Sequence, residues 1–293
     1  MTKVFLGIDG GASSAKWCVV NESGEKVFEG KSGPVDGHVY RAESRERLLL
    51  FLREIRSSIS SEILAVHVGL TGSPESPDNQ VELKALFGET LGVTRLTVEN
   101  DVYLGYRAAF GNEFGLFLYA GTGSILVYRS NDGEINRIGG WGYLLGDEGA
   151  GYWIGREAIR ETLSAMEEGR MSGLSEFVFE ASGGNSWDKI KRFVYSNSRE
   201  KIAELAHPVL QAAEIGEVDA RQVAIRAGLK LAGLVKRVER VLNKSNYPIT
   251  FSGGIAFASS IVKEVVEQEV GREVSLFSGD TAFAAANLAR SDF

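Results

Sequence analysis

A strand that runs into a glycine turn and returns as a second strand occurs twice in this chain. The first copy is FLGIDGGASSAKWCVV at residues 5–20, and the second is LFLYAGTGSILVYR at residues 116–129. Each copy joins apolar runs through small residues that permit a tight bend, which is typical of a buried β-hairpin. The pair is either an internal repeat, which predicts two similar halves of the molecule, or two unrelated hairpins.

The remaining sequence alternates strands with helices, and this alternation predicts an α/β fold. Further strands are expected at 25–30, 63–70, 95–99, 249–252 and 274–278. Helices are expected at 43–57, 80–92, 101–110, 149–167, 186–195, 199–214, 219–243, 257–270 and 280–290.

Composition and charge narrow the class of protein. The chain has 293 residues, of which 44% are hydrophobic and 24% charged, as in a globular protein. Its net charge of −7 and the lack of a long basic run argue against a nucleic-acid partner. Cys18 is the single cysteine, so an internal disulfide is excluded and a reduced, cytoplasmic setting is expected. No apolar run is long enough to predict a membrane span, and the N-terminal MTKVFLGIDGG reaches glycine and aspartate too soon to predict a signal peptide.

Three glycine turns follow apolar strands, at Asp9-Gly-Gly, at Ala120-Gly-Thr-Gly-Ser and at Ser252-Gly-Gly. Phosphate binding needs backbone N–H groups that no side chain obstructs, and nearby hydroxyls can complete the ring of donors. These turns therefore predict a nucleotide site, although any one of them alone could be only a tight turn. None has the spacing of a P-loop or of a dinucleotide-binding fingerprint.

Two aspartates stand directly after buried strands. Asp9 could hold Mg²⁺, which prefers one or two carboxylates plus phosphate oxygens, or it could cap a turn. Asp101 ends the VEND segment and precedes a helix. It could cap that helix, or it could act as a general base that accepts a proton from a substrate hydroxyl.

The stretch GGWGYLLGDEGAGYWIG at 139–155 combines dense glycine with aromatic residues and the acidic pair Asp147-Glu148. Glycine at this density weakens helices and strands alike, because glycine loses the most backbone freedom on folding. Bare backbone beside a carboxylate would suit the close approach of a polar ligand. Core packing is the alternative for its aromatic residues, and it is expected for Tyr152 and Trp153.

Taken together, GIDGGASSAK, GLTG, END, AGTGS, the 139–155 stretch and SGGI resemble the N-acetylglucosamine kinase-like group, with its BadF/BadG-type ATPases, of the sugar kinase, actin and heat-shock chaperone superfamily. The resemblance covers nearly the whole chain. It implies two similar ribonuclease H-like (actin-like ATPase) lobes with an active-site cleft between them. Residues 1–110 and the C-terminal helix 281–293 would form one lobe, and residues 111–280 the other.

The resemblance also implies an activity, namely ATP-dependent phosphorylation of a hydroxyl of N-acetylglucosamine or a related hexose or amino sugar. Asp101 would be the catalytic base, Asp9 would organise Mg²⁺ through water, and a homodimer would be compatible with the group. The residues implied to bind ATP are Gly10, Gly11, Ser13, Lys16, Gly121, Thr122, Gly123, Ser124, Gly253 and Gly254. Those implied to bind the sugar are Asp36, Thr71, Gly72, Asn100, Gly140, Trp141 and Asp147.

Two departures from the group's pattern bear on the substrate. Ala12 and Ser13 stand where a third glycine and a threonine are usual, and Ser13 keeps the hydroxyl. Asp36 stands where relatives often carry a sugar-binding asparagine. An ionised aspartate accepts hydrogen bonds but does not donate them, so a sugar with a free amine would suit it better than an N-acetyl sugar.

Two other functions are open from the sequence. One is a redox-activating ATPase of the acyl-CoA dehydratase activator type, which would need cysteine ligands for an iron–sulfur cluster. The other is a sugar-binding regulator without catalysis, which the presence of both Asp9 and Asp101 disfavours.

Overall fold

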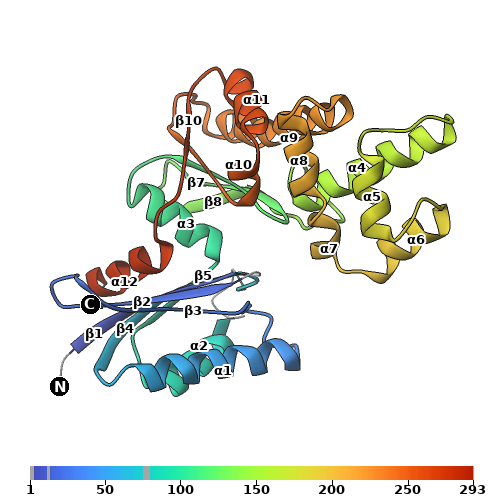
Figure 1. Cartoon of the computed structure of the whole chain (residues 1–293). Coiled ribbons are helices and arrows are strands. Elements are labelled where there is room, and N and C mark those ends of the chain that lie inside the picture. The colour runs from blue at the N-terminus through green and yellow to red at the C-terminus, as the bar shows by residue number, and fades with distance from the viewer. Residues whose placement is uncertain (1–2, 12–13, 75–79, 293) are drawn as a thin grey trace. The chain divides into compact units, whose positions relative to one another are not determined.

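The computed structural model describes residues 3–11, 14–74 and 80–292 (Figure 1). Two compact units make up the chain. Unit 1 comprises the residues up to Asn112 together with those from Gly279 onward, and unit 2 is Glu113–Ser278. Each unit is built around its own five-stranded sheet.

Unit 1 is a mixed sheet with helices on both faces. Its elements are β1 (Lys3–Gly10), β2 (Ala15–Asn21), β3 (Lys26–Ser32), α1 (Ala42–Ser58), β4 (Glu62–Leu70), α2 (Val81–Leu91), β5 (Leu96–Glu99), α3 (Asp101–Phe110) and α12 (Thr281–Ser291). The strand order is β3-β2-β1-β4-β5, in which β1, β2 and β3 form an antiparallel meander and β4 and β5 continue parallel to β1.

Unit 2 repeats this topology. Its elements are β6 (Leu116–Ala120), β7 (Ser124–Arg129), β8 (Ile135–Gly139), α4 (Gly151–Glu167), α5 (Ser175–Ser182), α6 (Trp187–Ser196), α7 (Arg199–Ala203), α8 (Ala206–Glu214), α9 (Val218–Leu242), β9 (Ile249–Ser252), α10 (Gly254–Ala258), α11 (Ser260–Val270) and β10 (Val274–Leu276). The strand order β10-β9-β6-β7-β8 again joins an antiparallel meander to two parallel strands. The predicted α/β fold with two similar lobes is therefore confirmed, and the two sequence copies are equivalent hairpins.

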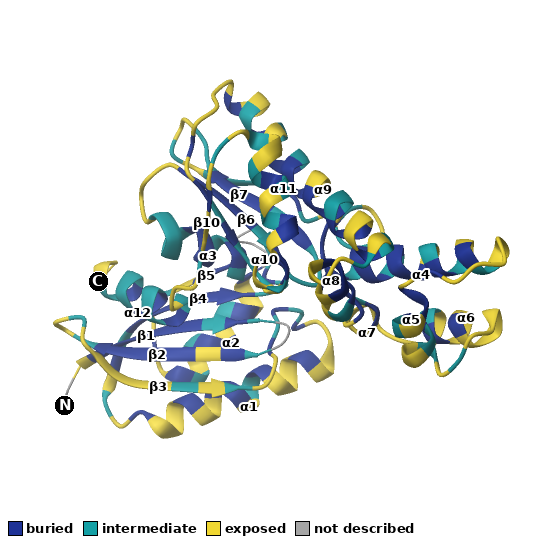
Figure 2. Cartoon of the chain, turned by 45° about the horizontal axis from the view of Figure 1, so that its top comes forward, coloured by how far each residue is buried: buried dark blue, intermediate teal, exposed yellow. Residues whose placement is uncertain are grey.

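Successive side chains of β1 point to opposite faces of the sheet, and apolar residues on both faces explain why helices cover both sides of the sheet in unit 1. Leu6 and Ile8 belong to a core that includes Leu48 and Leu52 of α1. On the opposite face, Phe5 packs with the alanines of α12. Figure 1 shows α1 and α2 on one side of this sheet and α12 on the other, and Figure 2 shows the buried strands between partly exposed helices.

Gly7 on β1 is what allows α12 to lie so close to the sheet. A Cβ atom at this position would lie 2.1 Å from both the carbonyl oxygen of Ala282 and the amide nitrogen of Ala286. Since real Cβ atoms do not approach backbone atoms so closely, a larger residue would push the helix away from the sheet. The small residues of α12, among them Ala282, Ala285, Ala286 and Ala289, are buried for the same reason.

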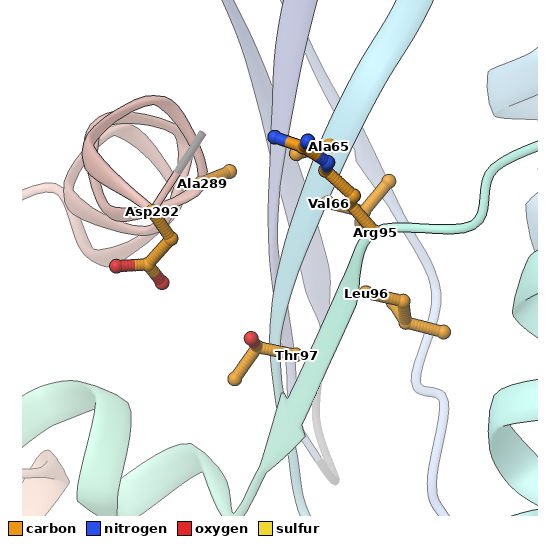
Figure 3. A pocket seen from close by; sticks show the side chains of 7 residues that line it. All are labelled: Ala65, Val66, Arg95, Leu96, Thr97, Ala289 and Asp292. Carbon is orange, nitrogen blue, oxygen red and sulfur yellow. The ribbon is translucent and has the colours of Figure 1, made fainter.

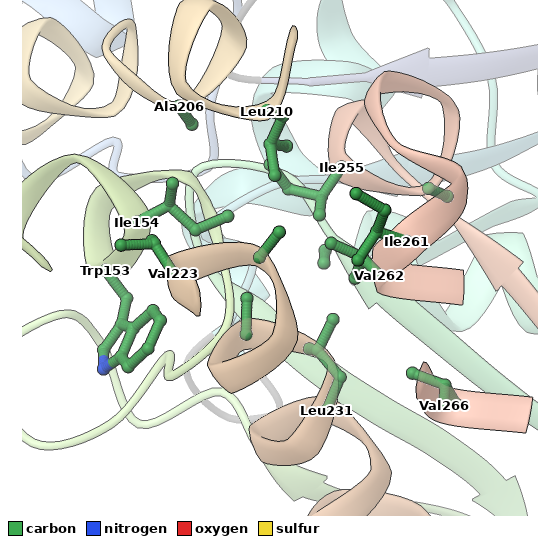
Figure 4. Close-up of a cluster of buried hydrophobic side chains, with 14 of the residues drawn as sticks. Trp153, Ile154, Ala206, Leu210, Val223, Leu231, Ile255, Ile261, Val262 and Val266 are labelled. Carbon is green, nitrogen blue, oxygen red and sulfur yellow. The ribbon is translucent and has the colours of Figure 1, made fainter. Parts of the chain in front are cut away.

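The core of unit 2 is centred on α9, whose buried positions recur at helical spacing along its 25 residues. Figure 4 shows Val223 and Leu231 of α9 among Trp153, Leu210 and Val262, which come from three other helices. Trp153 is 5% exposed, which agrees with the core position expected for it.

Several elements differ from those expected. The sequence did not predict β8 or α5, and the expected helix at 199–214 is two helices, α7 and α8. The expected helix at 257–270 is divided at Ser259, which adopts an extended conformation and accepts a hydrogen bond from the Val262 amide to begin α11. The Ser259 hydroxyl also donates to Glu214 at 2.8 Å, so a contact with α8 stabilises the break.

Among the described residues, no helix is both long enough and apolar enough to cross a membrane.

Candidate active site

Asp9 lies near the end of β1, where the buried strand leads into the first glycine turn. Its carboxylate accepts a hydrogen bond from the Thr281 hydroxyl at the start of α12. Lys16 lies opposite Asp9 in the β1–β2 hairpin. Burial raises the pKa of the Asp9 carboxyl, and the Thr281 hydrogen bond and the Lys16 charge offset only part of this effect.

Asp101 is the first residue of α3 and follows Asn100, whose side chain caps the helix by accepting from the Val102 amide at 3.0 Å. The Asp101 carboxyl keeps some exposed surface, yet burial and then the like charge of Asp9 raise its pKa to about 7. Hydrogen bonds from the Val102 amide and the Thr71 side chain act in the opposite direction without outweighing them. A carboxyl with this pKa can exchange a proton near neutral pH, as a general base must.

Thr71 and Gly72 form the turn after β4 and connect the two aspartate positions. The Thr71 amide donates to the Gly10 carbonyl at 2.8 Å, next to Asp9. The Thr71 side chain is hydrogen bonded to Asp101. The turn therefore links the end of β1 to the start of α3, and these predicted site residues lie together within unit 1.

Asp36 is surrounded by donors from the chain itself. Its Oδ1 accepts from the His38 amide at 3.0 Å and lies 2.9 Å from His38 Nδ1. Its Oδ2 accepts from the Ser44 hydroxyl at 3.0 Å and from Arg47 Nη2 at 2.9 Å. Burial opposes ionisation, but the hydrogen bonds from His38 and Ser44 outweigh it, so the pKa of Asp36 is lowered. A contact between Asp36 and a sugar stays a prediction.

In unit 2, residues 121–123 close the β6–β7 hairpin, and the Gly121 amide donates to the Gly123 carbonyl at 2.9 Å. The first turn of α4 lies against this hairpin. The Gly151 amide donates to the Gly121 carbonyl at 2.8 Å, and the Tyr152 amide donates to the Thr122 carbonyl at 3.1 Å. The 139–155 stretch is thus attached directly to the predicted phosphate turn.

The Ser252-Gly253-Gly254 turn lies beside the same hairpin. A Cβ atom on Gly253, whose φ is +93°, would lie 2.3 Å from the Ala120 carbonyl oxygen. Gly254 begins α10, and a Cβ there would meet no described atom within 4 Å. The two glycine turns predicted to bind the nucleotide in unit 2 are therefore neighbours.

Asp147 lies beside the predicted phosphate turn of unit 2. A Cβ on Gly123 would be 2.4 Å from Asp147 Oδ2, so glycine at position 123 makes room for this carboxylate. Oδ1 accepts from the Gly142 amide at 3.3 Å. Burial raises the pKa of Asp147, and the amide hydrogen bond and the charge of Arg199 oppose this. The residue predicted to bind sugar thus adjoins a residue predicted to bind phosphate.

Trp141 is exposed on the surface of unit 2. Its side chain is 55% exposed, and the Arg237 guanidinium lies 4.9 Å from the ring centroid. Leu144 and Leu145 in the same stretch are also largely exposed. Gly140 lies against Ile125, where a Cβ would be 2.7 Å from the isoleucine Cδ1. The sugar contacts expected for Gly140 and Trp141 stay predictions.

Close backbone packing accounts for part of the glycine density in 139–155. A Cβ on Gly149 would lie 2.6 Å from the Ala227 carbonyl oxygen of α9. A Cβ on Gly155 would lie 2.1 Å from the Ile202 carbonyl oxygen of α7. These two glycines let neighbouring helices approach α4 and its preceding loop, which is a structural reason for them that the sequence pattern did not indicate.

The structure brings most of the predicted site residues into one cluster in each unit. The unit 1 cluster contains Asp9, Gly10, Thr71, Gly72, Asn100 and Asp101, and the unit 2 cluster contains Gly121, Thr122, Gly123, Ser124, Asp147, Gly253 and Gly254. Ser13 lies outside the described residues, and Lys16 is exposed on β2 beside Asp9. Sequence reasoning missed Thr281, because its contact with Asp9 joins distant parts of the chain; the Asp280-Thr281 pair indicated only the start of a helix.

The carboxylate of Asp9 and its surroundings fit a magnesium ion bound through water. Asp9 and Asp101 are close enough for the charge of Asp9 to raise the pKa of Asp101. A cation bound to Asp9 through water molecules would relieve this repulsion. No cluster of three or more histidine, cysteine, aspartate or glutamate side chains among the described residues could form a complete metal cage. Mg²⁺ does not need such a cage, since it keeps several waters and shares substrate phosphates.

A separate cavity of about 320 Å³ lies in unit 1. Figure 3 shows it between the end of α12 and the edge of the sheet formed by β4 and β5. Its lining residues are Ala65, Val66, Arg95, Leu96, Thr97, Ala289 and Asp292. None of the predicted site residues is among them.

Comparison with known proteins gives consistent relationships over the whole chain. A model of the BadF/BadG/BcrA/BcrD ATPase family matches residues 6–279. N-acetyl-D-glucosamine kinase of Dictyostelium discoideum is 24% identical, with 98% of each chain covered. N-acetylmuramic acid/N-acetylglucosamine kinase of Clostridium acetobutylicum is 25% identical, with 99% of each chain covered.

The fold also has a close structural counterpart. The crystal structure of a Chromobacterium violaceum protein, named there as a candidate N-acetylglucosamine kinase, superposes with a TM-score of 0.80 at 23% identity. The match covers 98% of this chain and 99% of that one. At this identity the likeness shows the fold alone.

Proposed function

The chain belongs to the BadF/BadG/BcrA/BcrD ATPase family, and we propose that it is an ATP-dependent carbohydrate kinase. Its substrate would be N-acetylglucosamine or a related hexose or amino sugar, as for the two full-length relatives. The observation that carries this proposal is the environment of the Asp101 carboxyl. This carboxyl is hydrogen bonded to Thr71, lies near Asp9 and has a pKa of about 7.

In the proposed reaction, Asp101 accepts the proton of the attacking sugar hydroxyl. The sugar oxygen forms a bond to the γ-phosphorus of ATP, and the bond from that phosphorus to the β–γ bridging oxygen breaks, so ADP leaves. Asp101 needs to be ionised before this step, which its pKa allows at neutral pH. Such transfers depend mainly on positioning and electrostatic stabilisation.

Each unit carries a glycine turn that would bind phosphate oxygens. Gly10 and Gly11 would contribute from the β1–β2 hairpin, and Thr122 and Gly123 from the β6–β7 hairpin. When bound, Mg²⁺ neutralises charge on phosphate oxygens, and Asp9 would hold it through water. Asp147 would accept hydrogen bonds from sugar hydroxyls, and its position beside Gly123 supports a sugar next to the phosphate turn.

The state of Cys18 does not favour the alternative of a redox-activating ATPase. Its side chain is buried within β2, and burial raises the pKa of the thiol to about 11. A cluster ligand must be a thiolate that can be reached from the surface.

A coupled assay of ADP release tests the proposal directly. Purified protein with Mg-ATP is screened against hexoses, amino sugars and N-acetylated amino sugars, with the Asp101→Asn variant as the matched control. We expect sugar-dependent ADP release, and a sugar phosphate detected by mass spectrometry, only with the unaltered protein. ADP release that is the same with and without every sugar would contradict the proposal.

A further inference from the structure

The four hydrogen bonds on Asp36 leave little room for a sugar. An ionised carboxylate offers about four acceptor positions, two on each oxygen. His38 occupies two of them through its amide and its ring, and Ser44 and Arg47 occupy the other two. A sugar hydroxyl or ammonium would have to displace a donor that is already in place.

These donors attach the 33–39 loop to the first turns of α1. Ser44 is 3% exposed, and the Asp36 side chain is 17% exposed, so this end of the loop is held inside the unit. The adjacent Gly37 amide donates to the Thr71 carbonyl at 2.8 Å. A Cβ on Gly37 would lie 2.9 Å from the Ser73 backbone, so the loop lies directly on the Thr71 turn.

His38 adds a second contact between the loop and that turn. A Cβ on Gly72 would lie 2.3 Å from His38 Cε1, so the imidazole ring covers the Gly72 backbone. The ring is oriented by its contact with Asp36. Thr71 is therefore fixed on one side by Gly10 and on the other by a loop that depends on Asp36, and its side chain is bonded to Asp101.

We infer that Asp36 is a positioning residue, which holds the 33–39 loop against the Thr71 turn and thereby places the Thr71 hydroxyl on the Asp101 carboxyl. In the proposed kinase, Asp36 would thus act on the rate of phosphoryl transfer rather than on the choice of sugar. Only this kinetic consequence rests on the proposed function, since the anchoring of the loop is a property of unit 1 itself.

Two substitutions and a rescue test this role. In Asp36→Asn an amide nitrogen replaces one carboxylate oxygen and cannot accept, so either the two His38 donors or Ser44 and Arg47 lose their acceptor. Arg47→Ala removes one anchor and leaves Asp36 in place. Arg47→Lys should restore this anchor, because Arg47 contacts Asp36 through one hydrogen bond from one nitrogen, which a lysine ammonium can also donate. Arg45→Ala is the matched control on the same helix, since Arg45 pairs with Glu82 instead.

Hydrogen exchange of the Gly37 and Thr71 amides measures the anchoring without any activity. Exchange should be faster in Asp36→Asn and Arg47→Ala, and unchanged in Arg47→Lys and Arg45→Ala. Thermal denaturation of each variant shows whether the chain is still folded. Unchanged exchange in folded Asp36→Asn and Arg47→Ala would overturn the inference, even if the protein phosphorylates no sugar.

Kinetics then distinguish positioning from direct sugar recognition. We expect kcat to fall by about tenfold to a hundredfold in Asp36→Asn, the scale of a small misplacement of a reacting group. The fall should be the same for N-acetylglucosamine and glucosamine. A shift of their kcat/KM ratio toward the N-acetylated sugar, or faster exchange with an unchanged kcat, would show that Asp36 does not act through Asp101.

Discussion

At the scale of single residues, the proposed active-site chemistry depends on the raised pKa of the Asp101 carboxyl. Burial and the charge of Asp9 raise the pKa of Asp101 to about 7, while Thr71 and the Val102 amide limit the rise. The result is a carboxyl that is ionised in about half of the molecules at neutral pH and is basic enough to accept a proton from a hydroxyl.

Replacing Asp101 by asparagine removes the proton acceptor and keeps the shape of the side chain. Turnover should fall by about 10²-fold or more, the usual scale for losing a general base. Sugar binding, measured by calorimetry in the absence of turnover, should change much less. A near-normal kcat in this variant would exclude Asp101 as the base.

The same carboxyl should influence stability in a pH-dependent way. Folding raises the pKa of Asp101 from 3.8 to about 7, so the folded state binds a proton that the unfolded state releases. The contribution of Asp101 to the free energy of unfolding therefore decreases as pH rises from about 4 to about 7.

Asp101→Asn should remove this dependence. Denaturant unfolding at a series of pH values would measure the free energy of unfolding of both proteins. The value for the variant should rise relative to that of the unaltered protein as pH increases to about 7, and the difference should not change further above pH 7. A difference between the two that stays constant from pH 4 to pH 8 would contradict the raised pKa.

At the scale of elements, the sequence indicated most strands and helices because their hydrophobic spacing is local information. The strands before Asp9, Asp101 and Ala120 end where their apolar runs end, so the glycine turns and both aspartates could be placed in advance. The break between α10 and α11 at Ser259 depends on a hydrogen bond to Glu214. Asp9 likewise accepts a hydrogen bond from Thr281, which lies far away in the sequence. Such contacts between distant segments leave no periodic signal. The weakly buried β8 gave no clear signal either.

Gly7 offers a test of the close approach between β1 and α12. In Gly7→Ala the added methyl would meet two backbone atoms of α12 at 2.1 Å, so the helix must shift. We expect a loss of about 1–3 kcal/mol in the free energy of unfolding, typical of overpacking. Urea denaturation would measure it.

Gly233→Ala is the matched control in α9, where a Cβ would meet no described atom within 4 Å. Alanine favours a helix over glycine by about 1 kcal/mol, so this variant should be more stable. Equal effects of the two substitutions would argue against the packing of α12 described here.

At the scale of the whole molecule, the two units differ in how the chain builds them. Unit 2 is one continuous segment with its own core, whereas unit 1 needs α12 from the end of the chain to cover Phe5, Cys18 and Val20. Similar sheets are therefore completed in different ways, one by neighbouring sequence and one by a distant helix.

A fragment of residues 113–278 should accordingly fold alone, with a cooperative thermal transition and native-like circular dichroism. A fragment of residues 1–112 should lack one covered face and bind a hydrophobic dye or aggregate. Adding a peptide of residues 279–293 should reduce the dye binding. A stable, dye-free 1–112 fragment would show that α12 is dispensable.

The bond between Thr281 and Asp9 also sets an order of events during synthesis. Asp9 is synthesised before unit 2, while its hydroxyl partner and the helix that shields β1 are made only after all of unit 2. Until α12 is made, a nascent chain therefore carries an Asp9 carboxylate without its Thr281 partner and an uncovered apolar sheet face. The sheet of unit 1, although its first strand is made before unit 2, reaches its final packing only after unit 2 has been synthesised.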